Sequence, residues 1–216
     1  MKKFAVILSG CGVYDGAEIH EATLTMLAID KLGHSYDLFA PDIKQHHVIN
    51  HLTGEAVDEV RNVLVESARI ARGNIKGLDK LIPEYYDGLV LPGGFGVAKN
   101  LSSFAFDGAG CEVNDDLSKV VKQFALVGKP IGALCISPAV VAAIMDGVEV
   151  TIGSDAGTAE QVEKTGATHH KTSHGEVFHD AKNNVFSTPC YMLDASISQI
   201  AEGAENIIKQ MTEKGM

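Results

Sequence analysis

An apolar run that ends at a cysteine and passes at once into an alanine-rich stretch constrains this sequence more than any other feature. It reads Ile131-Gly132-Ala133-Leu134-Cys135-Ile136-Ser137-Pro138-Ala139. Small and aliphatic residues before Cys135 are typical of a strand covered on both faces, and Pro138 suits the first turn of a helix, where its missing N–H costs nothing. The pattern predicts a strand, a sharp turn at Cys135 and a helix over residues 138–145.

This placement gives Cys135 a possible chemical role. A thiol at the end of a strand and the start of a helix feels the positive end of the helix dipole and nearby free amides. Both favour the thiolate, so we expect the pKa of Cys135 to lie below the usual value of about 8.5 and the sulfur to be nucleophilic. A lone cysteine in an apolar strand can also be a small buried hydrophobic residue. The local sequence leaves both interpretations open.

Length and composition indicate a single domain, residues 1–216. Hydrophobic residues make up 45% of the sequence, which provides a sizeable core and argues against disorder. The formal charge of -10, from 18 basic and 28 acidic residues, disfavours nucleic acid and anionic membranes as partners.

The expected location is the cytoplasm. No stretch reaches the roughly 18 consecutive apolar residues that span a bilayer, and Met1-Lys2-Lys3 leads directly into a strand rather than a signal sequence. The cysteines are widely spaced, without a Cys-x-x-Cys pair, and we expect them to be reduced thiols. They are Cys11, Cys111, Cys135 and Cys190.

Apolar strands alternate with helices along the chain. Strands are predicted over residues 4–9, 35–40, 88–91, 131–134 and 148–152, with two short strands near 183–184. Helices are predicted over residues 18–32, 57–70, 114–127, 138–145 and 158–165, and from a cap at Asp194 to residue 211. Residues 97–113 are expected to form a long loop. This alternation predicts an open, mostly parallel, flavodoxin-like α/β sheet with helices on both faces.

Two glycine-rich turns follow predicted strands. Gly10-x-Gly12 lacks the third glycine of a dinucleotide fingerprint, and carboxylates crowd the following helix start, so no nucleotide cofactor is expected. Gly93-Gly94 would let backbone amides approach a ligand at a strand's carboxyl end, or would form a plain tight turn.

The histidines do not predict a metal site. His46 and His47 are adjacent, so they cannot both point the same way on a strand, and no Glu or Cys stands beside them at a ligand spacing. We interpret them, together with His51, as solvated surface residues and predict neither a metal nor a cofactor.

Several motifs together resemble a known superfamily. They are Gly16-Ala17-Glu18-Ile19-His20-Glu21-Ala22, Val90-Leu91-Pro92-Gly93-Gly94, Lys99-Asn100-Leu101-Ser102 and Ala133-Leu134-Cys135-x-x-Pro138. They resemble the PfpI and parkinsonism-deglycase superfamily of class I glutamine amidotransferase-like proteins. Two longer stretches, residues 6–16 and 48–55, look like its ElbB-type glyoxalase branch, the enhancing-lycopene-biosynthesis proteins. The resemblance covers nearly the whole chain.

The resemblance implies a nucleophile elbow at Cys135 and a glutamate whose carboxyl group hydrogen-bonds to the sulfur. Glu21 fits the family's register better than Glu18, but the two lie three residues apart on one helix, so the choice stays open. The implied oxyanion hole consists of the backbone amides of Gly94 and Ile136. The implied reaction is the conversion of glyoxal to glycolate through a Cys135 hemithioacetal, in a homodimer without a cofactor.

Departures from the family pattern keep other functions open. Many relatives carry a histidine directly after the cysteine or about twenty residues later, whereas this sequence has Ile136 and then Asp155 in that region. Asp155, like Gly93, could support the site, or it could simply cap a helix. His174-Gly175-Glu176 has the His-x-Glu spacing of glutamine hydrolases. The main alternative is a redox-sensing or regulatory binding protein with an oxidisable Cys135.

Overall fold

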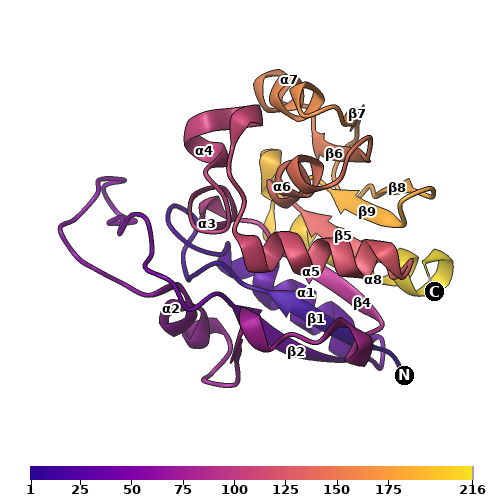
Figure 1. The fold of residues 1–216 in the computed structure, drawn as a ribbon, viewed down its shortest axis with the longest axis horizontal. Helices are drawn as coiled ribbons and strands as arrows, with labels where there is room; N and C mark the ends of the chain where they lie inside the picture. The colour runs from indigo at the N-terminus through magenta and orange to yellow at the C-terminus, as the bar shows by residue number, and fades with distance from the viewer. Residues whose placement is uncertain (216) are drawn as a thin grey trace.

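The computed structural model describes residues 1–215. The fold is built on a central sheet of seven strands (Figure 1). The strands of this sheet are β1 (Lys3–Ile7), β2 (Ser35–Ala40), β3 (Lys76–Gly77), β4 (Gly88–Leu91), β5 (Ile131–Leu134), β8 (Phe178–Asp180) and β9 (Val185–Thr188). Their order is β3-β2-β1-β4-β5-β9-β8. All neighbours pair in parallel except β8, which runs antiparallel to β9. The mostly parallel, flavodoxin-like sheet expected from the sequence is confirmed.

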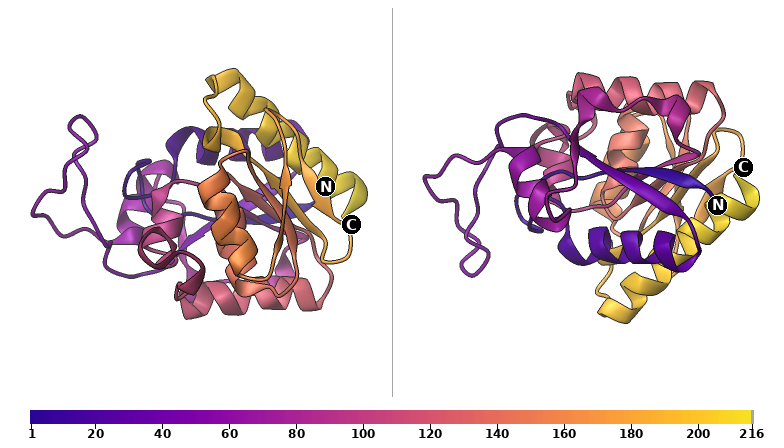
Figure 2. Two further views of the ribbon diagram at one scale, coloured as in Figure 1. Left: turned by 90° about the horizontal axis from the view of Figure 1, so that it is seen from above. Right: turned by 90° about the horizontal axis from the view of Figure 1, so that it is seen from below.

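Eight α-helices connect and cover the strands in the described part of the chain. They are α1 (Ile19–Lys31), α2 (Val63–Ile70), α3 (Phe95–Lys99), α4 (Phe104–Asp107), α5 (Asp115–Leu126), α6 (Ser137–Ile144), α7 (Ala156–Lys164) and α8 (Ile197–Lys214). Short 3₁₀ turns lie at η1 (Leu78–Lys80), η2 (Pro83–Tyr85), η3 (Gly108–Gly110) and η4 (Cys190–Met192). Helices α1 and α8 pack on one face of the sheet, and α5 lies on the other (Figure 2).

Both faces of the central strands are buried, which explains their continuous apolar sequences. Along β4, Leu89 and Leu91 pack into the core beneath α5 and α6, whereas Val90 points into the core beneath α1 and α8. The helices that cover the sheet are amphipathic. In α5, for example, Leu117 and Phe124 lie on one apolar stripe that faces the sheet.

Several segments differ from the sequence prediction. The last helix is capped by Ser196 rather than Asp194, and the strands expected near 183–184 lie before and after these residues. The helix expected over 57–70 begins only at Val63, because Asn62 caps it by accepting a hydrogen bond from Val65 N at 3.0 Å. The loop expected over 97–113 contains α4, and its first residues belong to α3. The strand expected over 148–152 is β6 (Glu149–Gly153), and it pairs with an unpredicted β7 (Thr168–Lys171) in a separate two-stranded sheet.

Residues 44–62, called the arm below, extend away from the sheet (Figures 1 and 2). Antiparallel bridges join Lys44 to Asn62 and Ile49 to Ala56, so the arm is a long, irregular hairpin. Every residue from 50 to 60 is exposed.

Candidate active site

Cys135 lies directly after β5, at the carboxyl edge of the sheet. Its φ is +59°, in the left-handed region that residues other than glycine rarely adopt, and its N–H donates to Thr188 O at 2.9 Å. Ser137, in the first turn of α6, donates its hydroxyl to Pro92 O at 2.9 Å, which ties this helix to the loop after β4. The sharp turn predicted at the cysteine is therefore present.

Glu21 is the carboxylate that contacts this cysteine. Its side chain, on the first turn of α1, is fully buried and hydrogen-bonds to the thiol of Cys135. Its Oε2 accepts from Gly93 N at 2.8 Å, and its Oε1 accepts from Tyr191 N at 3.2 Å. Glu18 instead caps α1 by accepting from Glu21 N at 2.7 Å. The sequence left the choice between the two glutamates open, and the structure shows that Glu21 is the one that contacts Cys135.

The protonation of this pair differs from the sequence expectation. Burial and the neighbouring charge of Glu18 raise the pKa of Glu21 to about 7. Burial and the charge of Glu21 also raise the pKa of Cys135 well above its ordinary value. Amide hydrogen bonds from Gly94 and Ile136 act in the lowering direction but are outweighed. The lowered thiol pKa predicted from the helix start is therefore wrong, because the enclosed sulfur faces a carboxyl group. The two groups share protons as a coupled pair.

The two glycines after β4 allow this close approach. A β-carbon on Gly93 would overlap with Cys135 Cβ and lie 2.6 Å from Glu21 Oε2. Gly94 has a φ of +101°, and a β-carbon there would overlap with the backbone of Gly16. Gly93-Gly94 is thus more than a tight turn, since the first glycine binds Glu21 and the second lies beside the sulfur.

A cavity of about 320 Å³ opens onto Cys135. Its walls are mostly apolar, and the residues that line it include no lysine or arginine. The lining residues are Val13, Gly94, Phe95, Cys135, Ile136, Asp155, Thr158, Tyr191 and Met192.

Sequence reasoning missed most of these wall residues. Tyr191 is an example, because it is 170 residues from Glu21 in the chain and reaches it only because β9 lies beside β5. No local motif marks such a contact. The phenol of Tyr191 also lies 2.9 Å from His20 Nδ1, and His20 directly precedes Glu21.

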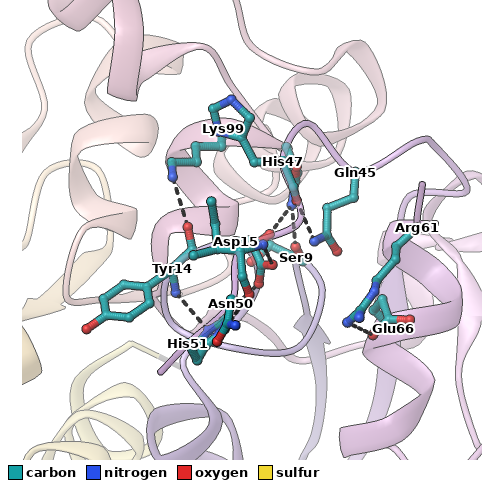
Figure 3. Close-up of polar contacts among 12 residues, drawn as sticks. Ser9, Tyr14, Asp15, Gln45, His47, Asn50, His51, Arg61, Glu66 and Lys99 are labelled. Atoms are coloured by element: carbon teal, nitrogen blue, oxygen red, sulfur yellow. Dashed lines mark hydrogen bonds and ion pairs between the residues drawn. The ribbon is translucent and has the colours of Figure 1, made fainter. Parts of the chain in front are cut away.

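The loop over residues 10–16, which carries Val13, is fixed by a polar network (Figure 3). Asp15 is buried and accepts from Ile49 N at 2.7 Å, and Lys99 Nζ donates to Tyr14 O at 2.9 Å. Tyr14 N donates to His51 Nε2 at 3.2 Å. The loop therefore connects the cavity with the arm.

Asn100, from the family-like motif, fastens the same loop. Its Nδ2 donates to Ser9 O at 2.9 Å and to Asp15 O at 2.8 Å, while its Oδ1 accepts from His46 N at 2.8 Å. Of the three histidines interpreted as solvated, His46 and His51 are exposed and His47 is half-buried. His51 also has the structural role given above.

The remaining candidate residues have structural roles. Asp155 is exposed and caps α7 by accepting from Thr158 N at 2.7 Å, although it also lines the cavity. His174 and Glu176 do not line the cavity, and Glu176 instead accepts from Ser173 N at 2.6 Å. The geometry therefore gives no Cys-His-Glu arrangement of the glutamine hydrolase kind at these residues.

Two further properties hold for the described residues. Within 1–215, no group of three or more His, Cys, Asp or Glu side chains is arranged to hold a metal ion. None of the helices in this part of the chain is both long enough and apolar enough to cross a membrane.

Two mammalian relatives align with almost the entire chain. The human protein "Glutamine amidotransferase-like class 1 domain-containing protein 3, mitochondrial" is 44% identical over 221 residues, covering 98% of this chain and 82% of the human protein. The rat "ES1 protein homolog, mitochondrial" is 45% identical over 221 residues, covering 98% and 83%. Both names contradict the cytoplasmic location expected from the sequence. That expectation rested on the lack of a long apolar stretch and of a recognisable signal sequence, which does not identify a compartment.

Solved structures show the same fold. A protein from Ehrlichia chaffeensis, described as an isoprenoid biosynthesis protein with an amidotransferase-like domain, has 41% identity and a TM-score of 0.90, covering 97% of this chain and 98% of that one. Drosophila melanogaster DJ-1beta shares the fold at 17% identity, with a TM-score of 0.59 and coverage of 99% and 90%. No protein-family model matches the sequence. On the strength of the two mammalian relatives, the chain belongs to the ES1 family of glutamine amidotransferase-like class 1 proteins.

Proposed function

We propose that the protein is a cofactor-independent glyoxalase that converts glyoxal, or another small 2-oxoaldehyde, to the 2-hydroxy acid. The observation that carries this proposal is the pairing of the Cys135 thiol with a buried glutamate whose pKa is about 7. A nucleophile and a carboxyl group able to exchange protons near neutral pH are what this reaction requires.

The first step forms a carbon–sulfur bond. The Glu21 carboxylate accepts the thiol proton while Cys135 Sγ adds to the aldehyde carbon, giving a hemithioacetal. The amides of Gly94 and Ile136, which already lie beside Sγ, would stabilise the negative charge that develops on the aldehyde oxygen. Glu21 can then return its proton to that oxygen. A thiol with a raised pKa can take part because its base is in contact with it.

The second step moves a proton between the two substrate carbons. Glu21 removes the C–H proton from the carbon bonded to sulfur and delivers it to the neighbouring carbonyl carbon, leaving a thioester. Water then breaks the S–C bond and restores the thiol. Glyoxal and water thus give glycolate and a proton, and the oxidation of one carbon balances the reduction of the other.

The cavity favours this substrate class over glutamine. Its volume of about 320 Å³ accommodates a small molecule, and its lining lacks a basic residue that would pair with an amino acid's carboxylate. Asp155 contributes a negative charge instead, because its capping hydrogen bond with Thr158 lowers its pKa. These features support a small, uncharged carbonyl compound.

The test is glyoxal consumption with glycolate production, followed by NMR. We expect Cys135→Ser to abolish activity and Glu21→Gln to slow it at least tenfold, because the variants remove the nucleophile and the proton shuttle. Activity should rise with pH through about 7, since Glu21 must be ionised to act as the base. Cys111→Ser, at a half-buried thiol that does not line the cavity, is the matched control. Unchanged turnover in Cys135→Ser would refute the mechanism.

A further inference from the structure

A second buried thiol, Cys190, lies next to Cys135 and has no part in the reaction above. It follows β9, which pairs with β5 so that Leu134 stands beside Thr188. The two cysteines are therefore one and two residues past that pair, in the turns that follow two neighbouring strands. Cys135 N donates to Thr188 O at 2.9 Å, so the backbone of Cys135 lies beside the strand end that Cys190 follows by two residues. A disulfide requires Cα atoms about 4.4–6.8 Å apart, a range that residues on two adjacent turns can reach.

The two thiols also belong to one apolar core. Both side chains belong to the apolar core beneath α1 and α8, with exposed fractions of 7% for Cys135 and 5% for Cys190. Burial raises the pKa of Cys190 well above its ordinary value, and the charges of Glu21 and Cys135 raise it further. The three groups are thus within electrostatic range of one another.

The backbone is unusual at both cysteines. Among residues 1–215, only four residues other than glycine have a positive φ, and two of them are Cys135 at +59° and Cys190 at +44°. Such conformations cost free energy, persist only where the surrounding structure enforces them, and concentrate at functional sites. The turn at Cys190 also brings Tyr191 N to Glu21, but the reaction proposed above gives no role to the Cys190 thiol.

We propose that Cys190 is a resolving thiol, which captures Cys135 as an intramolecular disulfide after a hydroperoxide has oxidised it. The cavity gives access to Cys135, whereas Cys190 is absent from the cavity lining. A peroxide therefore meets Cys135 first, and Cys190 meets only the oxidised sulfur of its neighbour.

The chemistry balances in two steps. Cys135 Sγ attacks one oxygen of hydrogen peroxide, which breaks the O–O bond and gives sulfenic acid and water. Cys190 Sγ then attacks the sulfenic sulfur, and the hydroxyl leaves with a proton as a second water. The two sulfurs are oxidised and both peroxide oxygens are reduced. A dithiol such as dithiothreitol restores the two thiols, so the disulfide protects Cys135 from irreversible oxidation to sulfinate.

The experiment is mass mapping of the reduced, full-length protein after titration with hydrogen peroxide. Free thiols are blocked with N-ethylmaleimide, and the protein is digested without reductant. We expect a linked Cys135–Cys190 peptide as the main product, reversible by dithiothreitol. In Cys190→Ala the linked peptide must be absent, and Cys135 should instead gain two oxygens. Cys11→Ala and Cys111→Ala, at half-buried thiols, are matched controls that should retain the link.

Three results would overturn the proposal. One is equal accumulation of Cys135 sulfinate in the wild type and in Cys190→Ala. Another is linkage of Cys135 to Cys11 or Cys111. The third is an unmodified Cys135 at peroxide doses that oxidise Cys11. The wild-type peptide map decides the question even where Cys190→Ala folds poorly. None of these readouts involves an aldehyde, so the outcome is independent of the glyoxalase proposal.

Discussion

Glu21 combines full burial with two amide hydrogen bonds, and these act on its protonation in opposite directions. Burial disfavours the carboxylate, whereas the N–H groups of Gly93 and Tyr191 favour it. The net result is a pKa of about 7. Both carboxyl oxygens of Glu21 accept a hydrogen bond from a backbone N–H group. In Glu21→Gln, the side-chain NH₂ group would replace one of these acceptors and face an N–H donor. Activity measurements on Glu21→Gln therefore need a stability measurement beside them.

We also predict how the ionisation of Glu21 changes the stability of the fold with pH. The folded-state pKa of Glu21 is raised, from the ordinary value of 4.5 to about 7. The protonated carboxyl therefore stabilises the fold at pH values below about 4.5, and this contribution is lost as pH rises through about 7. The shift corresponds to about 3 kcal/mol at most.

Urea unfolding at pH 5 and pH 8 tests it. Histidines with lowered pKa values, such as His169 and His179, change stability in the opposite direction over this range, so the wild type alone is insufficient. The informative quantity is the difference in unfolding free energy between wild type and Glu21→Gln. We expect that difference to shift in favour of the variant between pH 5 and pH 8. A difference that does not change with pH would mean that Glu21 is not buried in this way.

At the scale of elements, the site is assembled by three turns at one edge of the sheet. The turn after β4 supplies Gly93 and Gly94, the turn after β5 supplies Cys135, and the turn after β9 supplies Tyr191. In parallel sheets, the carboxyl ends of neighbouring strands meet at the same edge, where ligands bind. Small residues are required where these turns approach one another.

Gly93→Ala tests that requirement. The added methyl would overlap with Cys135 Cβ and displace the Glu21 carboxyl, so we expect a loss of glyoxal turnover of at least tenfold and a lower melting temperature. Gly110→Ala is the matched control, since a β-carbon there meets no atom within 4 Å. Equal turnover in the two variants would show that the contact between Glu21 and Cys135 is dispensable.

Strands and helices could be predicted where the local residue pattern fits only one type of element. The strands 35–40 and 88–91 agree with β2 and β4. The apolar run over 88–91 is uninterrupted, whereas β2 is apolar and buried only from Leu38 to Ala40. The helix expected over 57–70 is too long, because the side chain of Asn62 caps the helix and starts it at Val63. The raised pKa of Cys135 and the wall residue Tyr191 both depend on contacts between distant segments, which local patterns do not encode.

For the whole molecule, the arm is the feature that the fold itself does not explain. Ile49 N of the arm donates a hydrogen bond to Asp15, and His51 accepts one from Tyr14 N, so the arm stabilises the loop beside the cavity. The distal part of the arm, residues 50–60, is exposed throughout. Leu52 is 94% exposed and Val60 is 73% exposed. We predict that these exposed apolar side chains of the arm belong to an interaction surface.

The family resemblance implies a homodimer, and the arm is where we expect the second copy to bind. Leu52→Asp combined with Val60→Asp should reduce the dimer fraction measured by sedimentation velocity, because burying a carboxylate at an interface is costly. The melting temperature at low protein concentration should stay unchanged, since neither side chain packs against its own chain. Leu126→Asp is the matched control, because Leu126 is 85% exposed at the far end of α5. If the control and the arm variant dissociate equally, or neither dissociates, the interface lies elsewhere. If the arm variant also loses glyoxal turnover, the coupling runs through Asp15 and the loop that carries Val13.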